Sequence, residues 1–362
     1  MKEKFKLYGS IFILIIFVPY LLTVLMRGGF GGKQTDPVQE HIEERLPFVV
    51  AREISIDSES ECLKAQMIIA RTNLWKSYQK TMEEELQING NTSGSNLEEA
   101  NKINEEATDK TQNGGNVSEE NLSAEKETGK SRTSESDKSK KTQDSDIEWS
   151  VSDSGLESYT EEELKKIWGT SYESNMEKLR QAVEETSDEI LTYEDLPIQA
   201  AYHYAANCKT RNASEVPGQE DYIWLQSVDS EDDMLADGFL SVNYMEKQDF
   251  VNALASIFQD EVLDAEQMPG ALELSNRDSI GYVTEVTYGT TVANGEAVRE
   301  ALHLNSACFY LSELEGKIRI VTKGIGHGLG LSQYGANELA KQGKNCREIL
   351  TYYYTGVSIE PW

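Results

Sequence analysis

Two segments of the sequence carry residue types that could move protons or bind a polar ligand. In the first, Glu61 follows Ser58 by three positions and precedes apolar residues at helical spacing. A carboxyl on the first turn of a helix can face a cleft, where burial raises its pKa for acid catalysis and the nearby Lys64 lowers it. The alternative is a structural Glu61 that closes a capping box with Ser58. Glu53 and Glu59 are the other candidate carboxylates nearby.

The second segment, residues 324–336, reads Gly-Ile-Gly-His-Gly-Leu-Gly-Leu-Ser-Gln-Tyr-Gly-Ala. Its alternating glycines match neither GxGxxG nor a P-loop, which argues against nucleotide binding. They predict backbone at positive φ or backbone that another group approaches closely. His327 lies among these glycines. Its side chain either faces a ligand or has a structural role as a hydrogen-bonded residue.

The elements that must position these residues are helices and strands without a repeating βαβ order, which predicts an α+β fold of mixed and antiparallel strands. Thr160 and Glu163 form a capping-box pattern. Helices are expected from near Ser58 onward and near residues 160–168, 172–185, 250–258, 332–342 and 347–354. A hairpin is expected over residues 190–204 with its turn at Glu194-Asp195, and strands at 222–228, 282–288, 308–311 and 318–322.

The N-terminus predicts a membrane anchor. Leu7–Met26 contains no charged residue, and twenty residues of helix span roughly the 30 Å of a bilayer core. Lysines precede this run, so the positive-inside rule places the N-terminus in the cytoplasm and the remainder outside. A cleaved signal peptide is the rival interpretation, but the long run ends without a small-residue cleavage site.

Composition divides the chain further. We expect an anchor at 1–27, a linker at 28–44, the first part of a domain at 45–86, an insertion at 87–149 and the second part at 150–362. Residues 91–148 contain no aromatic side chain and little apolar surface, which predicts disorder. An interdomain linker is the alternative to an insertion.

Charge and cysteine content exclude some functions. The net charge of −29 disfavours nucleic acid as a partner. The four cysteines form no CxxC pair, so we expect no metal and no cofactor, whereas a disulfide stays possible in an exported domain. A cysteine peptidase using Cys208 and His327 has the residue types but no nucleophile motif.

The segment that contains Glu61 and the glycine-rich segment both resemble motifs of a known protein family. Residues 61–72, Glu-Cys-Leu-Lys-Ala-Gln-Met-Ile-Ile-Ala-Arg-Thr, are similar to the EALKAQAxAART helix of the stage II sporulation protein D family. Residues 324–336 resemble its KGxGHGxGMSQYGA element. Segments 162–169, 197–207 and 298–306 also fit, so the resemblance covers about residues 45–86 and 150–362.

The resemblance implies a lytic transglycosylase that cuts MurNAc–GlcNAc linkages of peptidoglycan during engulfment of the forespore. Such an enzyme prefers strands that a partner amidase has stripped of peptides, and it works beside other engulfment membrane proteins. One glutamate, which maps onto Glu61, first protonates the glycosidic oxygen and then takes the proton of the sugar's 6-hydroxyl. Substrate-binding positions map onto Tyr202, Asn207, His327, Gln333 and Tyr334.

The sequence also departs from the family pattern. The DSTxxQVY element is not recognisable at residues 153–159, and Ser55, Cys62 and Ala206 replace the expected proline, alanine and small polar residue. A second hypothesis is therefore a module of the same fold that binds glycan or recruits an amidase without cutting.

Overall fold

Helices and paired strands are intermixed along the chain. The computed structural model describes residues 36–108 and 154–362, with backbone alone for residues 86–108. The helices are α2 Pro37–Glu53, α3 Ser60–Thr108, α4 Glu161–Trp168, α5 Tyr172–Glu185, α6 Lys247–Leu254, α7 Gly295–Ala301, α8 Gln333–Lys341 and α9 Cys346–Tyr353. The strands are β1 Glu189–Tyr193, β2 Leu196–Pro197, β3 Tyr202–His203, β4 Leu240–Met245, β5 Glu273–Arg277, β6 Val283–Tyr288, β7 Thr291–Asn294, β8 Phe309–Leu314, β9 Lys317–Lys323, β10 Leu331–Ser332 and β11 Ser358–Pro361. The predicted α+β class is confirmed.

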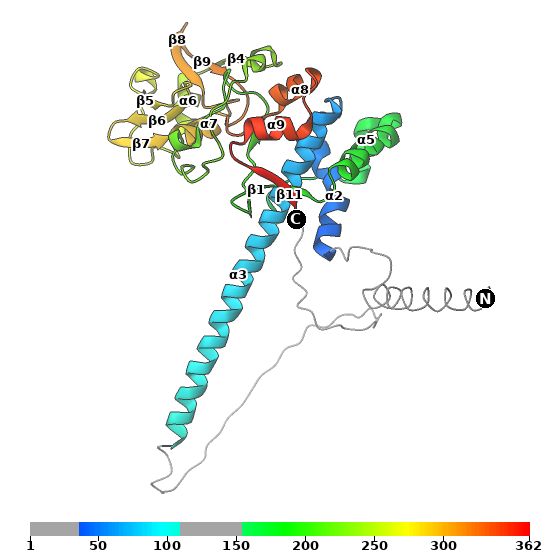
Figure 1. Cartoon of the computed structure of the whole chain (residues 1–362). Coiled ribbons are helices and arrows are strands. Elements are labelled where there is room, and N and C mark those ends of the chain that lie inside the picture. The colour runs from blue at the N-terminus through cyan, green and yellow to red at the C-terminus, as the bar shows by residue number, and fades with distance from the viewer. Residues whose placement is uncertain (1–35, 109–153) are drawn as a thin grey trace, which may run out of the picture.

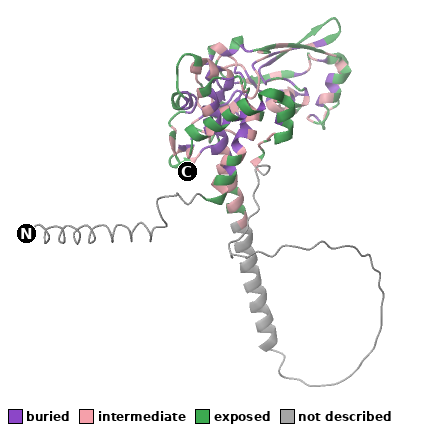
Figure 2. Cartoon of the chain, turned by 90° about the vertical axis from the view of Figure 1, so that its right-hand side faces the viewer, coloured by how far each residue is buried: buried purple, intermediate pink, exposed green. Residues whose placement is uncertain are grey.

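One part of the molecule is built around α3. Helices α2, α5, α8 and α9 and strand β1 pack against it (Figure 1). Strand β1 pairs antiparallel with both β11 and β2, while β3 and β10 form a short parallel pair. Buried apolar residues from both sides of the 109–153 gap share this core, among them Leu46, Met67, Leu179 and Leu350. Figure 2 shows the buried positions gathered where these elements meet.

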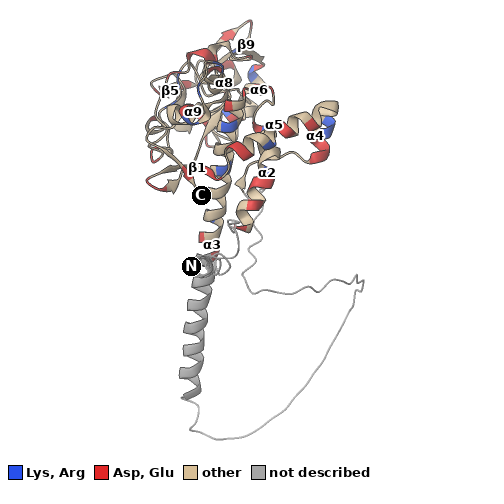
Figure 3. Ribbon diagram, turned by 45° about the vertical axis from the view of Figure 1, so that its right-hand side comes forward, with Lys and Arg blue, Asp and Glu red and all other residues tan. Residues whose placement is uncertain are grey.

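The other part consists of two antiparallel sheets, ordered β4-β9-β8 and β5-β6-β7, with helices α6 and α7. Alternation along β9 directs Ile318 and Ile320 into a second core with Phe250 and Phe309. Acidic side chains lie along α2, α4 and α5 of the helical part (Figure 3), in keeping with the strongly negative net charge.

A buried arginine holds several elements of the helical part together. Arg71 on α3 is fully buried, and its guanidinium makes a bidentate contact with Glu43 on α2, at 2.5 and 2.9 Å. It also donates to the hydroxyl of Thr186 and the carbonyl of Glu189. One side chain therefore joins α2, α3, the end of α5 and the start of β1.

We predict that Glu43→Ala lowers the free energy of unfolding by about 3 kcal/mol, because it leaves the buried charge of Arg71 without its partner. The adjacent and exposed Glu44 offers a matched control, and Glu44→Ala should change stability by less than about 0.5 kcal/mol. Chemical denaturation of both variants measures the difference. Equal losses would show that the contact between Arg71 and Glu43 contributes nothing specific.

Most elements expected from the sequence are present, with three differences. The turn at Glu194-Asp195 is confirmed, and both residues have positive φ, but the second hairpin arm ends at Pro197, which lacks an N–H for pairing. Residues 222–228 form a turn at Ile223 and Trp224, closed by the hydrogen bond from Leu225 N–H to the carbonyl of Tyr222, and then an irregular stretch instead of the predicted strand. Helix α3 continues to Thr108 and so enters the segment 91–148 that the sequence predicted to be disordered, although residues 87–97 include two glycines and several Asn, Ser and Thr residues, which are weak helix formers.

The predicted anchor Leu7–Met26 and residues 109–149 of the predicted insertion lie outside the described residues and stay predictions. Among the residues that are described, no helix is both long and apolar enough to cross a bilayer.

Candidate active site

The end of α2 meets the start of α8 at a small polar cavity. Asp36 caps the first turn of α2, and the helix ends at Glu53, whose backbone carbonyl accepts a hydrogen bond from Gln333 Nε2 at 2.9 Å. The cavity measures about 260 Å³. Its lining residues are Glu53, Ile54, Ser55, Asp57, Ser58, Tyr204, Gln333, Tyr334 and Asn337. Two carboxyls, two amides and two tyrosines thus converge from three segments that are distant in sequence.

Glu53 is the titratable group best suited to hold a proton here. It is half-buried, and the Tyr202 hydroxyl donates a short hydrogen bond to its Oε2. Burial raises the pKa of Glu53, and the hydrogen bond from Tyr202 and the charge of Arg52 only partly offset this effect. Burial and the carboxylate together raise the pKa of Tyr202, so its phenol remains a donor. A carboxyl with a raised pKa can act as a general acid near neutral pH.

Glu61 has a different environment. Its Oε1 accepts from Lys64 Nζ at 2.6 Å and its Oε2 from the backbone N–H of Cys346 at 2.8 Å. Lys64 also bridges to Glu185 at 2.5 Å. Burial raises the pKa of Glu61, but these hydrogen bonds and the ammonium charge outweigh it and lower the pKa below its ordinary value. The carboxylate therefore stays charged and stabilises the N-terminus of α9.

The capping box expected between Ser58 and Glu61 is not formed, because both carboxylate oxygens of Glu61 bind these other donors. Ser58 N–H bonds to the carbonyl of Ser55 instead. The helix also begins later than Ser58, at Ser60.

The glycine-rich segment forms the wall beside Tyr202 and His203. Gly324, Gly326, Gly328 and Gly330 all have positive φ, as their alternation predicted. At Gly330 a Cβ would lie 1.9 Å from the carbonyl oxygen of Ala201, so no larger residue fits against β3.

His327 takes part in the internal hydrogen bonding of this segment. Its Nδ1 accepts from Leu329 N–H at 3.0 Å, and its carbonyl accepts from the buried Arg211 at 3.1 Å. Burial and the charges of Arg299 and Arg211 lower its pKa to about 4, so the ring is neutral at physiological pH. Its ring lies 5.8 Å from that of His203, whose pKa falls to about 3 mainly through burial.

The buried Asp233 holds the other side of the site together. Its carboxylate accepts from Ala206 N–H at 2.6 Å and from Ser332 Oγ at 2.7 Å, and Ser332 in turn caps α8 through Gly335 N–H. Burial raises the pKa of Asp233 to about 6 in spite of these bonds. No motif in the sequence pointed to this residue.

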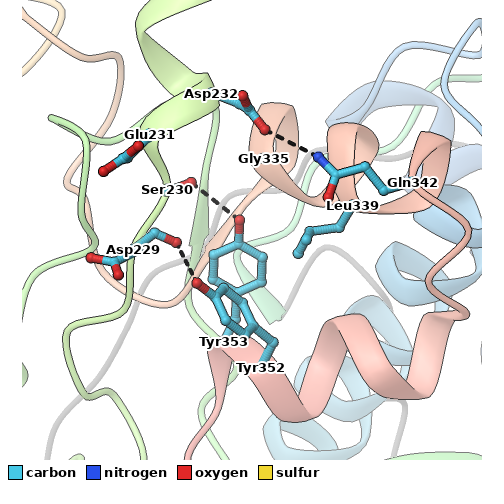
Figure 4. A pocket seen from close by; sticks show the side chains of 9 residues that line it. All are labelled: Asp229, Ser230, Glu231, Asp232, Gly335, Leu339, Gln342, Tyr352 and Tyr353. Carbon is cyan, nitrogen blue, oxygen red and sulfur yellow. Dashed lines mark hydrogen bonds between the residues drawn. The ribbon is translucent and has the colours of Figure 1, made fainter.

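A second hollow, of about 360 Å³, lies on the opposite face of α8 (Figure 4). Two of its three carboxylates are engaged, since Asp229 pairs with Lys209 and Asp232 accepts from Gln342. The described residues contain no group of His, Cys, Asp and Glu side chains that could hold a metal, and their four cysteines are free thiols.

The structure thus brings together some of the residues expected from the sequence. Gln333 and Tyr334 line the cavity, and the hydroxyl of Tyr202 donates a hydrogen bond to the carboxylate of Glu53, which also lines it. Asn207 lies apart from these lining residues and donates to the carbonyl of Ile280 at 2.8 Å. Tyr204 and Asn337 were not expected from the sequence, although both belong to segments that fit the family motifs or follow them directly.

The fold and cavity define an α+β protein with a half-buried acid in a polar, tyrosine-walled cleft. Residues 32–193 match the sequence model of the family described as "Stage II sporulation protein". Over 206 residues, the chain is 36% identical to "Stage II sporulation protein D" of Bacillus amyloliquefaciens, which covers 54% of this chain and 55% of that protein. The protein of the same name from Bacillus subtilis (strain 168) is 37% identical over the same shares.

The comparisons support the resemblance to the stage II sporulation protein D family that the motifs predicted. A 51-residue stretch is also 43% identical to the uncharacterized protein BHWA1_00569 of Brachyspira hyodysenteriae, over 14% of each chain. The chain spans about half the length of the curated stage II relatives it matches.

We predict that His327→Ala lowers the free energy of unfolding by about 1–3 kcal/mol, because Leu329 N–H loses its acceptor inside the loop. His327→Asn should recover part of the loss, since the amide oxygen can accept in place of Nδ1. Thermal denaturation measures both variants. A stable His327→Ala protein that no longer binds glycan would instead place the imidazole in ligand binding.

Proposed function

We propose that this protein is a peptidoglycan lytic transglycosylase that cleaves MurNAc–GlcNAc linkages during sporulation, with Glu53 as the proton-transferring group. The single observation that carries the proposal is the raised pKa of a half-buried glutamic acid in a polar cleft. The resemblance alone suggests Glu61, whose ion pair with Lys64 keeps it charged. An acid catalyst must hold its proton at the start of the reaction, which favours Glu53.

The cleft suits one sugar unit of a strand. Its volume of about 260 Å³ lies below the 300–1,000 Å³ typical of sites for drug-sized ligands. Tyr204 and Tyr334 lie edge to face at 6.3 Å and offer rings to the apolar face of a pyranose. Asn337 and Gln333 offer amide groups for sugar hydroxyls.

The reaction needs only one carboxyl. Glu53 gives its proton to the glycosidic oxygen, the bond from that oxygen to the MurNAc anomeric carbon breaks, and the GlcNAc-side strand leaves as an alcohol. The carboxylate then takes the proton of the MurNAc 6-hydroxyl, whose oxygen bonds to the anomeric carbon and closes a 1,6-anhydro ring. Glu53 ends protonated again, and no water is consumed. A glycosidase that adds water generally needs a second carboxyl.

The proposal includes the setting inferred from the sequence. The N-terminal run Leu7–Met26 holds the enzyme to the membrane with its N-terminus in the cytoplasm and the catalytic domain on the outer face. A cell-wall amidase supplies peptide-stripped strands, and other engulfment membrane proteins are the expected partners.

The assay for this proposal compares two isosteric substitutions on peptide-stripped glycan strands. Glu53→Gln should slow the formation of 1,6-anhydro ends by about 10²–10⁴-fold, because the amide cannot transfer the proton. Glu61→Gln should keep activity within about threefold per folded molecule while costing about 1 kcal/mol of stability. Mass spectrometry of the products and denaturation curves provide the two readouts.

The reverse pattern, with Glu61→Gln inactive and Glu53→Gln active, would return the catalytic role to Glu61. Reducing ends in place of anhydro ends would identify a hydrolase. Strands left intact by the unmodified protein would identify a binding or amidase-recruiting module.

Tyr202 gives a pH-dependent prediction. Its hydrogen bond favours the charged form of Glu53 and so lowers the pKa of that carboxyl. Tyr202→Phe should therefore raise the pKa further, and activity should persist to a higher pH before the acid form is lost. The pH profile of kcat/KM measures this, and a shift of the alkaline limb toward lower pH would contradict the assignment of Glu53 as the acid.

A further inference from the structure

The sheet β4-β9-β8 has an uncovered face. Alternate residues of its central strand, such as Ile318 and Ile320, enter the core, and their neighbours point the other way. Tyr244, Tyr310 and Leu314 are 55%, 42% and 46% exposed. The side chains that make up this outer sheet face include Val242, Tyr244, Tyr310, Leu314, Arg319 and Lys323.

Two cations on the central strand of this face lack acidic partners among the described residues. Arg319 pairs across the sheet with Tyr244 and makes no ion pair or side-chain hydrogen bond with any described residue. Lys323 lies over the ring of Tyr310, 5.7 Å from its centroid, and it too has no carboxylate partner in the described part of the chain. By contrast, Lys317 at the sheet end pairs with Glu246 at 2.5 Å. In a chain with a net charge of −29, two unneutralised cations between tyrosines suit an anionic ligand.

The outer sheet face also adjoins the glycine-rich segment. Strand β9 ends at Lys323, and Ile325 then pairs with Ala205, the residue after the cleft tyrosine Tyr204. On the other side, a Cβ at Gly281 would lie 3.7 Å from Tyr310 Oη and 3.8 Å from Asn207 Nδ2. The backbone from Lys323 to Ile325, through its pairing with Ala205, therefore joins this face to the candidate active site.

We propose that the outer sheet face is a second docking surface for the glycan strand, outside the cleft, that recognises the lactyl carboxylates of peptide-stripped MurNAc. Removal of the stem peptide frees one carboxylate in each disaccharide, and the sugar rings present apolar faces to tyrosines. Arg319 and Lys323 are four residues apart on β9, roughly 13 Å, so they engage carboxylates of different sugar units. This proposal rests on the proposed function, because it takes the same polymer as the ligand.

Co-sedimentation of the full-length chain in detergent micelles with glycan strands tests the docking surface. The variant Arg319→Glu/Lys323→Glu should bind peptide-stripped strands roughly tenfold more weakly, because two surface ion pairs become repulsive. The matched control Lys166→Glu/Arg180→Glu makes the same change in net charge on exposed sites of α4 and α5 and should bind as the unmodified protein does. Chitin, which lacks carboxylates, should bind both variants alike. Thermal melting confirms that each variant is folded, and the milder Arg319→Gln/Lys323→Gln should lose less affinity.

Cleavage of the same strands by the unmodified protein reports on the proposed function separately. If the protein cuts strands but the charge reversal binds them as tightly as the control, the docking surface is wrong and the proposed function stands. If strands bind through Arg319 and Lys323 but are not cut, the docking surface stands and the enzyme assignment is wrong. A dimer in sedimentation that the charge reversal splits would overturn the docking proposal, since the face would then bind a second copy.

Discussion

The contact of Glu53 with Tyr202 and Gln333 is the constraint on which the site depends. The side chain of Glu53 binds the phenol of Tyr202 and its backbone binds the amide of Gln333, so the end of α2 is held to β3 and to the start of α8. Each of these segments is fixed independently. Arg71 and Glu43 clamp α2 on α3, and Asp233 holds Ser332 beside Ala206. The cleft is therefore part of the core packing and not a feature of a loose surface loop.

Two glutamates eight positions apart have opposite electrostatic roles because their surroundings differ. Burial removes solvent from Glu53, and the nearby charge of Arg52 only partly offsets the cost of keeping the carboxylate charged, so the pKa of Glu53 rises. Glu61 gains an ammonium group and a helix N-terminus, and its pKa falls. Divergent environments for neighbouring carboxyls are a common basis for dividing catalytic and structural duties. Under the proposed function, this division gives proton transfer to the end of α2 and helix docking to the start of α3.

The sequence predicted the α+β class, the positive φ of the glycine-rich segment, the helix 172–185 where α5 lies, and the resemblance to the family. These depend on local periodicity, glycine chemistry and motif, which short windows of sequence contain. The choice between Glu53 and Glu61 depends on burial and on partners such as Cys346, hundreds of positions away, which no window contains. The same limit applies to Asp233, a single acidic residue whose three-segment network appears only in the folded chain.

The central claim is that the pKa of Glu53 lies above the ordinary glutamate value and the pKa of Glu61 below it. Titration of the side-chain carboxyl carbons by NMR, with each resonance assigned through its Gln variant, tests this directly. We predict that Glu53 titrates above the ordinary glutamate value of 4.5 and Glu61 below it. A Glu53 resonance that titrates below that value, with Glu61 above it, would contradict the account.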